Sequence, residues 1–446
     1  MTRILRILPC SRRPVGSGLE LFIDRLGAES IRLSFTRPHV PSNKIAGPLP
    51  TTVAEYTAPT MSTGGPLIDL RRYADREHLL LASYAMHSSD SAGRVEHESP
   101  HAYRGPYGRD RDRILHSSAF RRLSGKMQVF TGEMGTYHRT RLTHTFEVAS
   151  VARTLARVLR LNEDLTEALA LMHDIGHPPY GHCGEDVLSE CMQSVGGFSH
   201  NQFALTIVEE LEQRYHAFAG LNLSAETLAG QDTRAHKSEA AVGRAPLLEV
   251  QIVDAADSIA YDAHDIDDAL QMGLLSIDSL SELRIIRRAM RRVREKAGEL
   301  PTGAMRQLLV HELIDLQVSD LLQVSIELLQ TAQGMTADDV RDAGIRVHHS
   351  ETLAAERAEL ERFLFNAVYR HPRLIPVRES AANRVRVLFD VLSQTPSRLP
   401  LRFRRRAESL PLDRVIGEYI AGMTDQFCDQ QFASLEHSTA GPLADW

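Results

Sequence analysis

The sequence predicts an all-α protein, a central helical bundle with additional helices toward the C-terminus. Of the 446 residues, 43% are hydrophobic but only 6% are aromatic, and Leu, Ala and Arg are frequent, a composition that favours helix. Several segments repeat apolar residues at the three- and four-residue spacing of one helix face. We find no two-residue alternation beyond a few residues and no internal repeat, so strands are not expected.

The expected elements divide the chain into four parts. Residues 1–65 combine recurrent Pro and Gly with weak periodicity, which predicts a disordered extension, and Met61 is an alternative start. Residues 66–110 form a connecting segment with a short helix over 70–84, residues 111–275 the core, and residues 276–446 a C-terminal helical region. The strongest helices are expected over 141–159 and over 162–172, where Asn162 is the candidate N-cap. The others are expected over 201–214, 247–270, 278–299, 303–332, 352–369, 380–394 and 411–434.

Composition argues against several classes of protein. The chain has 51 basic and 58 acidic residues, a net charge of -7, which disfavours a globally basic nucleic-acid binder. Its four cysteines form no CxxC pair, so neither a disulfide framework nor a zinc ribbon is expected. No apolar run reaches the roughly 18 residues of a membrane span, and no secretory signal is evident. We therefore expect a cytoplasmic protein without a membrane partner.

Four residues form a candidate metal site. His173 and Asp174 are adjacent, and on a regular helix neighbouring side chains point about 100° apart. Gly176, with prolines close behind it, predicts a helix end where both could turn inward. His144 lies on the apolar face of the preceding helix, and Asp257 lies within an apolar helix, where a lone carboxylate needs a partner. The mixed nitrogen and oxygen donors suit a divalent ion, with Mn, Mg, Co, Fe, Ni and Zn not distinguished.

Further polar residues follow closely in the sequence. His177, His182, Glu185 and His200 could supply a general acid and the groups that orient it. The alternative is that His182 and His200 only cap loops.

A second candidate lies on the helix that carries Asp257. Asp257, Tyr261 and Asp265 stand at i, i+4 and i+8, on one helix face. A metal ligand, a phenol and a carboxylate in line would suit a substrate with phosphate at one end and a sugar at the other. For Tyr261 the alternative is ordinary core packing.

Several basic residues precede the metal site in the sequence. They include Lys126, Arg139, Arg141 and those of the run 109–113. Several cations are what a triphosphate needs. A solvated, salt-bridged surface remains the alternative.

These motifs together resemble a known family, the HD-domain deoxyguanosine triphosphate triphosphohydrolases, in their bacterial branch. The matching blocks, in order over about residues 100–435, are RDRILHSSAFRRLSGKMQVF from Arg111, RLTH from Arg141, HDIGHPPYGH from His173, FSHN from Phe198, GLNL from Gly220, DSIAY from Asp257 with His264-Asp265, and YIAGMTD from Tyr419.

The resemblance implies an HD-type helical fold and hydrolysis of deoxynucleoside triphosphates to deoxynucleoside and inorganic triphosphate. It implies that His144, His173, Asp174 and Asp257 hold the metal ion. It further implies that His182, Glu185 and His200 form the catalytic group. The expected phosphate contacts are Arg141, Lys126 and His177. The residues expected at the sugar or base are Tyr261, Asp265, Gln128 and Val129. Family members form homo-oligomers, and some respond to an allosteric nucleotide or to single-stranded DNA.

Two positions depart from the animal relatives: Ser258 replaces a lysine and Asn201 a glutamate. No motif identifies the base-reading residues, so dGTP and other deoxynucleoside triphosphates remain open as substrates. Two alternative functions are an HD phosphohydrolase acting on other nucleotides, and a nucleotide sensor or nucleic-acid binder using the basic segments 287–296 and 398–406.

Overall fold

The computed structural model describes residues 20–25, 31–36, 73–101, 103–128, 139–236, 243–298, 301–437 and 441–446. The chain divides into two compact units, Met1–Asp69 and Leu70–Trp446. Most of the predicted extension, including Met61, lies outside the described residues. Within the first unit, β1 (Glu20–Arg25) and β2 (Ile31–Thr36) form an antiparallel pair with Glu20 opposite Thr36 and Arg25 opposite Ile31. These strands were not predicted, although residues 31–36 alternate apolar and polar side chains.

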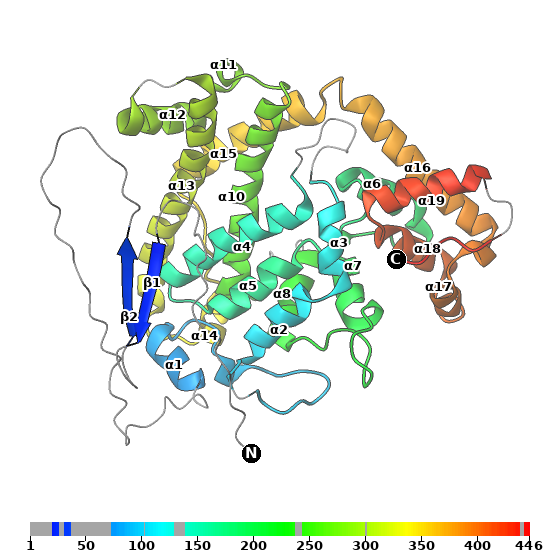
Figure 1. Ribbon diagram of the computed structural model, residues 1–446, viewed down its shortest axis with the longest axis horizontal. Coiled ribbons are helices and arrows are strands. Elements are labelled where there is room, and N and C mark those ends of the chain that lie inside the picture. The colour runs from blue at the N-terminus through cyan, green and yellow to red at the C-terminus, as the bar shows by residue number, and fades with distance from the viewer. Residues whose placement is uncertain are drawn as a thin grey trace, which may run out of the picture. The chain divides into compact units, whose positions relative to one another are not determined.

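The second unit is built from helices, which confirms the all-α prediction for this unit (Figure 1). Their bounds are α1 Tyr73–Leu80, α2 Pro106–Leu115, α3 Ser118–Arg122, α4 Arg141–Val158, α5 Glu163–Met172, α6 His182–Cys191, α7 His200–Thr206, α8 Ala225–Ala235, α10 Leu248–Gln271, α11 Ile277–Leu280, α12 Arg284–Ala297, α13 Thr302–Leu329, α14 Ala337–Asp342, α15 Glu351–Leu364, α16 Ile375–Gln394, α17 Leu401–Arg406, α18 Leu412–Ala421 and α19 Asp425–His437. A π-helical turn, Phe365–Tyr369, continues α15. Among the described residues, no helix is both long and apolar enough to cross a membrane.

Helices α4, α5 and α10 form the centre of the unit. Asn162 caps α5 as predicted, and its side chain accepts a hydrogen bond from the Leu165 amide at 3.1 Å. The predicted apolar face of α4 is buried at Val148, Ala152 and Leu155. Phe146 lies on the same helix but is 50% exposed, because it follows His144 by only two residues and so points away from the buried face.

Helix α10 connects two hydrophobic cores. Its first half, through Ala260, packs in the larger core with α4 and α5, and its second half, from Ala263, packs with α12, α13 and α15. Asp257 therefore lies within one straight element, close to the junction of the two cores. A residue at this junction is held by packing on both sides, which favours a precisely placed site.

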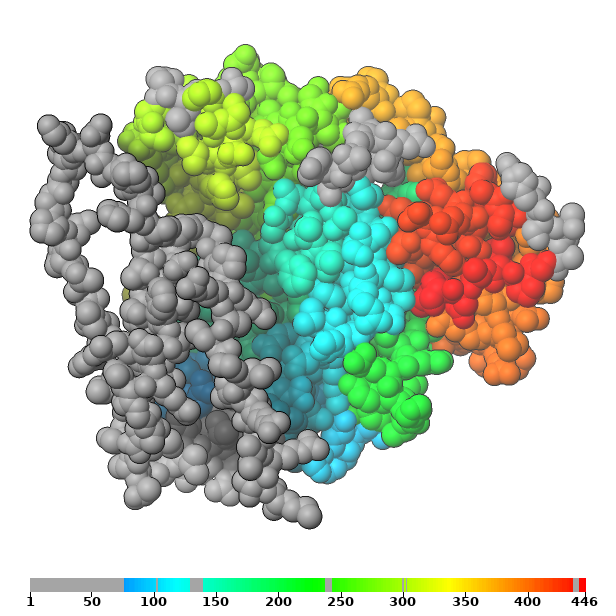
Figure 2. Space-filling model, in the orientation of Figure 1, coloured from blue at the N-terminus to red at the C-terminus, as the bar shows by residue number. Residues whose placement is uncertain are grey.

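Helix α16 packs on α18, α19 and α6, and α18 also packs on α6. In Figure 2 the C-terminal helices α16, α18 and α19 form a block, in orange and red, beside the cyan segment that includes α3, where Arg122 lies 4.1 Å from the Trp446 ring centre. A single helix was predicted over 411–434, but α18 ends at Ala421 and α19 begins at Asp425. At Gly422 a Cβ atom would lie 2.0 Å from the Trp446 ring, so the ring can pack in this place only against a glycine.

Asp425, the first residue of α19, ties this block to two loops of the core. Its carboxylate accepts hydrogen bonds from the backbone amides of Tyr180, at 2.9 Å, and Met127, at 3.0 Å. The side chain is 9% exposed, and burial raises its pKa. One buried carboxylate thus fixes both loops at once.

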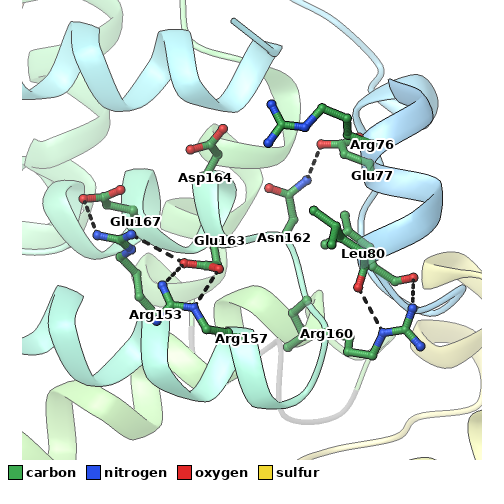
Figure 3. Close-up of a pocket in the computed structure, with 12 residues that line it drawn as sticks. Arg76, Glu77, Leu80, Arg153, Arg157, Arg160, Asn162, Glu163, Asp164 and Glu167 are labelled. Carbon is green, nitrogen blue, oxygen red and sulfur yellow. Dashed lines mark hydrogen bonds and ion pairs between the residues drawn. The ribbon is translucent and has the colours of Figure 1, made fainter. Parts of the chain in front are cut away.

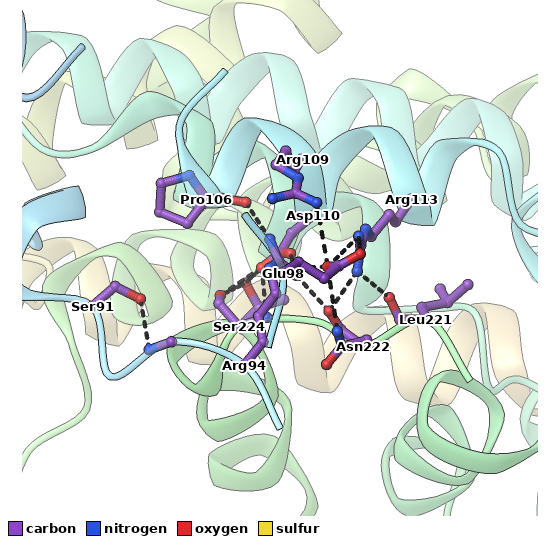
Figure 4. Close-up of polar contacts among 12 residues, drawn as sticks. Ser91, Arg94, Glu98, Pro106, Arg109, Asp110, Arg113, Leu221, Asn222 and Ser224 are labelled. Atoms are coloured by element: carbon purple, nitrogen blue, oxygen red, sulfur yellow. Dashed lines mark hydrogen bonds and ion pairs between the residues drawn. The ribbon is translucent and has the colours of Figure 1, made fainter. Parts of the chain in front are cut away.

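The connecting segment before α2 is held to the core by a network of charged residues (Figure 4). Arg94 pairs with the fully buried Asp110 at 2.5 Å, and Asp110 also accepts from the Ser224 amide at 2.9 Å. Arg113 pairs with Glu98 at 2.5 Å. Removing one partner of such a buried pair costs about 3–5 kcal/mol, so this network stabilises the segment rather than serving chemistry.

A hollow of about 490 Å³ between α1, α4 and α5 also contains several arginines (Figure 3). Arg153 and Arg157 pair with Glu163 at 3.5 and 2.7 Å. Arg160 donates to backbone carbonyls, including that of Leu80 at 3.0 Å. Because these three cations are paired within the protein, the hollow does not resemble an anion site.

Candidate metal centre and active site

Three helices bring the four predicted metal ligands together. His144 lies on α4, His173 and Asp174 follow the end of α5, and Asp257 lies on α10. His144 Nε2 is 3.1 Å from Asp257 Oδ1. His173 Nε2 lies 3.6 Å from both Asp174 Oδ1 and Asp257 Oδ1. His144, His173 and Asp174 therefore bring ligand atoms within 4.8 Å of one another, and the Asp257 carboxylate lies beside both imidazoles.

The hydrogen bonds of His173 leave one ring nitrogen for a cation. Its Nδ1 lies 2.6 Å from the Ala170 carbonyl oxygen, so Nδ1 carries the proton and Nε2 a lone pair. Nε2 is buried and has no hydrogen-bond partner among the described residues. A buried lone pair facing two carboxylate oxygens is unfavourable by itself, but it fits a divalent ion with nitrogen and oxygen ligands.

Arginines keep both carboxylates charged. Asp174 pairs with Arg141 at 2.9 Å, and Asp257 with Arg234 at 2.9 Å. Burial by itself raises both pKa values, but the charge of Arg141 holds the pKa of Asp174 below its ordinary value. The pKa of Asp257 is likewise held well below its ordinary value by His173, His144 and Arg234. Both side chains are therefore available as ionised ligands.

Arg234 was not predicted from the sequence. It lies on α8, is 8% exposed, and pairs with Asp254 as well as Asp257, both at 2.9 Å. No motif surrounds it. The only sequence feature that could have indicated it is the presence of an arginine on a helix otherwise rich in small residues.

The turn after Asp174 depends on glycine for two different reasons. Gly176 was expected to end the helix, and α5 ends at Met172. The structure adds a close approach, because a Cβ atom on Gly176 would lie 2.0 Å from the His200 carbonyl oxygen. Gly181 has φ 60°, and Tyr180 before it has φ 61°, so this loop uses the left-handed region that glycine favours.

The predicted catalytic group assembles around Glu185. His200 donates to its carboxylate both from Nδ1, at 2.8 Å, and from the backbone amide, at 2.9 Å. His182 Nδ1 lies 3.4 Å from the other carboxylate oxygen. Burial raises the pKa of Glu185, but the two histidines outweigh it and the pKa falls below its ordinary value. An ionised Glu185 thus orients both rings.

His177 connects this group to the metal ligands. Its ring stacks on that of His200, with centroids 3.8 Å apart, and its Nε2 lies 3.3 Å from Asp174 Oδ1. Burial and the charge of Arg141 lower the pKa of His177 well below its ordinary value. The ring is therefore neutral.

The residues expected at the phosphates, Arg141 and Lys126, and those expected near the sugar or base, Gln128 and Val129, differ in placement. Arg141 and Gln128 line the cavity described below, and Val129 lies outside the described residues. The Lys126 ammonium is buried behind His177. It donates to the backbone carbonyls of His177 and Ala421, and burial lowers its pKa well below the ordinary value.

The predicted sugar-side residues form a cluster with one residue that was missed. Tyr261 and Asp265 lie on α10, and Tyr369, from the turn after α15, hydrogen-bonds to both. Asp265 is fully buried, and burial raises its pKa to about 8. Tyr369 lies 104 residues from Asp265, and sequence spacing gives no signal for such a contact.

One cavity of about 430 Å³ joins these groups. Its lining includes the four predicted metal ligands and also Arg141, His177, His182, His200, Tyr261 and Tyr369. Its size is in the range of small-molecule sites. The lining does not include Lys126, Glu185 or Asp265. Each of these three hydrogen-bonds to a residue that does line it.

The basic segments considered for nucleic-acid binding pair largely within the protein. These pairs include Arg288–Glu356 at 3.0 Å, Arg292–Glu312 at 2.6 Å and Arg406–Glu418 at 2.5 Å. Their charge is therefore partly offset by neighbouring carboxylates.

Two family models match parts of the chain. A family model described as HD domain matches residues 141–262, and one described as phosphohydrolase-associated domain matches residues 347–434. The first covers all four predicted metal ligands, and the second covers Asp425.

Relatives named deoxyguanosinetriphosphate triphosphohydrolase-like protein match most of the chain. The protein from Nitrosomonas europaea is 38% identical over 365 residues, 80% of this chain and 97% of the relative. Those from Thiobacillus denitrificans and Bordetella pertussis are each 42% identical, over 78% and 80% of this chain and 94% and 96% of the relatives. The chain therefore belongs to the family of deoxyguanosinetriphosphate triphosphohydrolase-like proteins, whose HD domain marks it as a hydrolase.

Proposed function

We propose that the protein is a metal-dependent hydrolase of deoxynucleoside triphosphates, with dGTP or several of them as substrates, that releases deoxynucleoside and inorganic triphosphate. The observation that carries the proposal is the arrangement along one cavity. Metal donors lie beside a group of histidines with Glu185, and a Tyr261–Tyr369–Asp265 cluster lies further along α10. At 1.5 Å per residue, Tyr261 and Asp265 stand about 6 and 12 Å along the helix from Asp257. That span fits a nucleotide with its α-phosphate at the metal and its sugar at the tyrosines.

His144, His173, Asp174 and Asp257 would hold the divalent ion. When bound, it would supply Lewis-acid stabilisation of charge on an α-phosphate oxygen. Arg141 lines the same cavity and would offset further charge on the triphosphate. Lys126 would act indirectly, by fixing the His177 backbone.

The proton transfers fall to His182 and His200. Each ring faces Glu185 with Nδ1, so each has Nε2 free to accept or donate a proton. Water attacks the α-phosphorus and loses a proton, the bond from this phosphorus to the 5′-oxygen breaks, and the leaving oxygen takes up a proton. The stoichiometry is one water consumed for each deoxynucleoside and triphosphate released. The geometry is compatible with either histidine in either role.

Product analysis tests the proposal. The purified protein is incubated with each deoxynucleoside triphosphate, alone and in mixtures, with Mn²⁺, Mg²⁺ or Co²⁺, and the products are separated by ion-exchange chromatography. We expect inorganic triphosphate and deoxynucleoside in equal amounts, and no product with excess chelator. Pyrophosphate or single phosphate as the product, or turnover only of deoxynucleoside monophosphates or cyclic dinucleotides, would refute it.

The mixtures also test a further part of the proposal, that the protein is a homo-oligomer with an activating nucleotide. Activity in a mixture that exceeds the sum of the separate activities would support activation. Light scattering with and without nucleotide measures the oligomer. Single-stranded DNA, to which some members of the family respond, is added to the same assay at several salt concentrations, since binding through phosphates weakens with salt.

A further inference from the structure

A chain of four polar side chains runs outward from the metal ligand His144. His144 Nδ1 lies 3.2 Å from Nδ1 of His264, and Nε2 of His264 lies 2.6 Å from the Glu147 carboxylate. Glu147 in turn pairs with Arg139. The chain crosses twice between helices, because His144 and Glu147 lie one turn apart on α4, while His264 lies two turns after Asp257 on α10.

The direction of each hydrogen bond follows from the metal. His144 faces Asp257 with Nε2, so Nε2 must offer its lone pair to the ion and a neutral His144 carries its proton on Nδ1. That proton can be accepted only by a lone pair on Nδ1 of His264. His264 then carries its own proton on Nε2 and donates it to Glu147, whose pairing with Arg139 supplies a charged acceptor.

His264 is well placed for this role. It is 4% exposed and its ring meets that of His144 edge-on, with centroids 5.4 Å apart. It does not line the cavity, so it contacts neither the substrate nor the ion. Both of its ring nitrogens are used within the chain of contacts.

We propose that His264 is a positioning residue that holds His144 in the tautomer and orientation needed for metal binding, with Glu147 and Arg139 fixing His264 in turn. The inference rests on the metal site of the proposed function, but not on its substrate or product. Outer partners of metal-bound histidines characteristically change metal affinity by about 10–100-fold when removed.

Two substitutions at His264 separate positioning from packing. His264→Leu removes the acceptor and leaves the His144 Nδ1 proton buried without a partner. His264→Asn keeps an acceptor, because Oδ1 of asparagine can stand where Nδ1 of histidine stood. The matched control is His311→Leu, at an exposed position on α13. Affinity for Mn²⁺ is measured without nucleotide, from the electron paramagnetic resonance signal of the free ion.

We expect His264→Leu to raise the Mn²⁺ Kd by about 10–100-fold, His264→Asn to recover most of the affinity, and the control to match the wild type. Equal losses in the Leu and Asn variants, or no loss in either, would overturn the inference. A wild-type protein that binds no Mn²⁺ would also overturn the inference.

A second pair of variants guards against a His264 variant that fails to fold. Glu147 has a side chain that is 46% exposed, so folding should tolerate its replacement. Glu147→Gln retains an acceptor for His264 and should bind Mn²⁺ nearly as the wild type does, whereas Glu147→Leu should bind it more weakly. Equal affinity in these two variants would contradict the role of Glu147. If the order of affinities holds but no deoxynucleoside triphosphate is cleaved, the positioning role stands and only the proposed function fails.

Discussion

Gly176→Ala should separate metal binding from catalysis, because this glycine is where the loop after Asp174 meets α7. The added Cβ atom would lie 2.0 Å from the His200 carbonyl oxygen and 2.6 Å from the Ala204 amide nitrogen. Both are backbone atoms, so no side-chain rotation relieves the overlap. Ordinary contact begins at 3.4 Å, and the two backbones must therefore separate by about 1.4 Å.

That movement has two expected costs. Overpacking of this kind destabilises by about 1–3 kcal/mol, measurable as a lower midpoint of urea unfolding. A displacement of about 1 Å at a catalytic residue can cost about 10²-fold in rate, so kcat/KM for triphosphate release should fall by that order. The Mn²⁺ Kd should change much less, because α7 carries His200 but none of the four metal donors.

The control is Gly303→Ala on α13, where a Cβ atom would meet nothing within 4 Å. Alanine should be neutral there, or stabilising by about 0.5–1 kcal/mol, with unchanged turnover. Wild-type stability and activity in Gly176→Ala would refute the close-approach argument. A parallel loss of Mn²⁺ affinity would show that the ligands, rather than His200, had moved.

Two further predictions concern charged groups of the site. Glu185→Gln removes the charge that orients His182 and His200, and kcat should fall by about 10²–10⁴-fold with the Mn²⁺ Kd unchanged; a kcat within a few-fold of the wild type would exclude this role. Asp265 has its pKa raised to about 8, against about 3.9 when unfolded, so between these values the folded state holds a proton that the unfolded state has lost. The free energy of unfolding that this proton contributes is present below pH 4 and is lost as the pH rises through 8. Asp265→Asn should therefore gain stability relative to the wild type in urea unfolding from pH 5 to pH 9, and parallel pH profiles would count against a buried, protonated Asp265.

Much of the site could be predicted because its residues lie in short motifs on well-defined helices. The turn after His173-Asp174, the Asn162 cap and the spacing of Tyr261 and Asp265 along α10 all depend on local geometry, which a sequence carries directly. The convergence of His144 with Asp257 was inferred from the chemical need of a buried carboxylate for a partner.

What could not be predicted depends on contacts between distant segments. Arg234 and Tyr369 reach the site from helices with no distinctive pattern, and their partners lie 23 and 104 residues away. Lys126 was expected to contact phosphate, yet its ammonium group is directed to the carbonyls of His177 and Ala421. The strand β2 could have been predicted, since residues 31–36 alternate apolar and polar side chains, although the alternation is short.

The contacts of Asp425 bear on how this family can diversify. Its carboxylate lies in the segment that matches the phosphohydrolase-associated domain, but it holds the Tyr180 backbone inside the segment that matches the HD domain. Recombination that joined these segments from two distant relatives would have to preserve a left-handed Tyr180 and the carboxylate together. The two segments are therefore expected to be inherited as one unit. A chimera would first test whether the hydrogen bond between Tyr180 and Asp425 is preserved, and only then the substrate specificity.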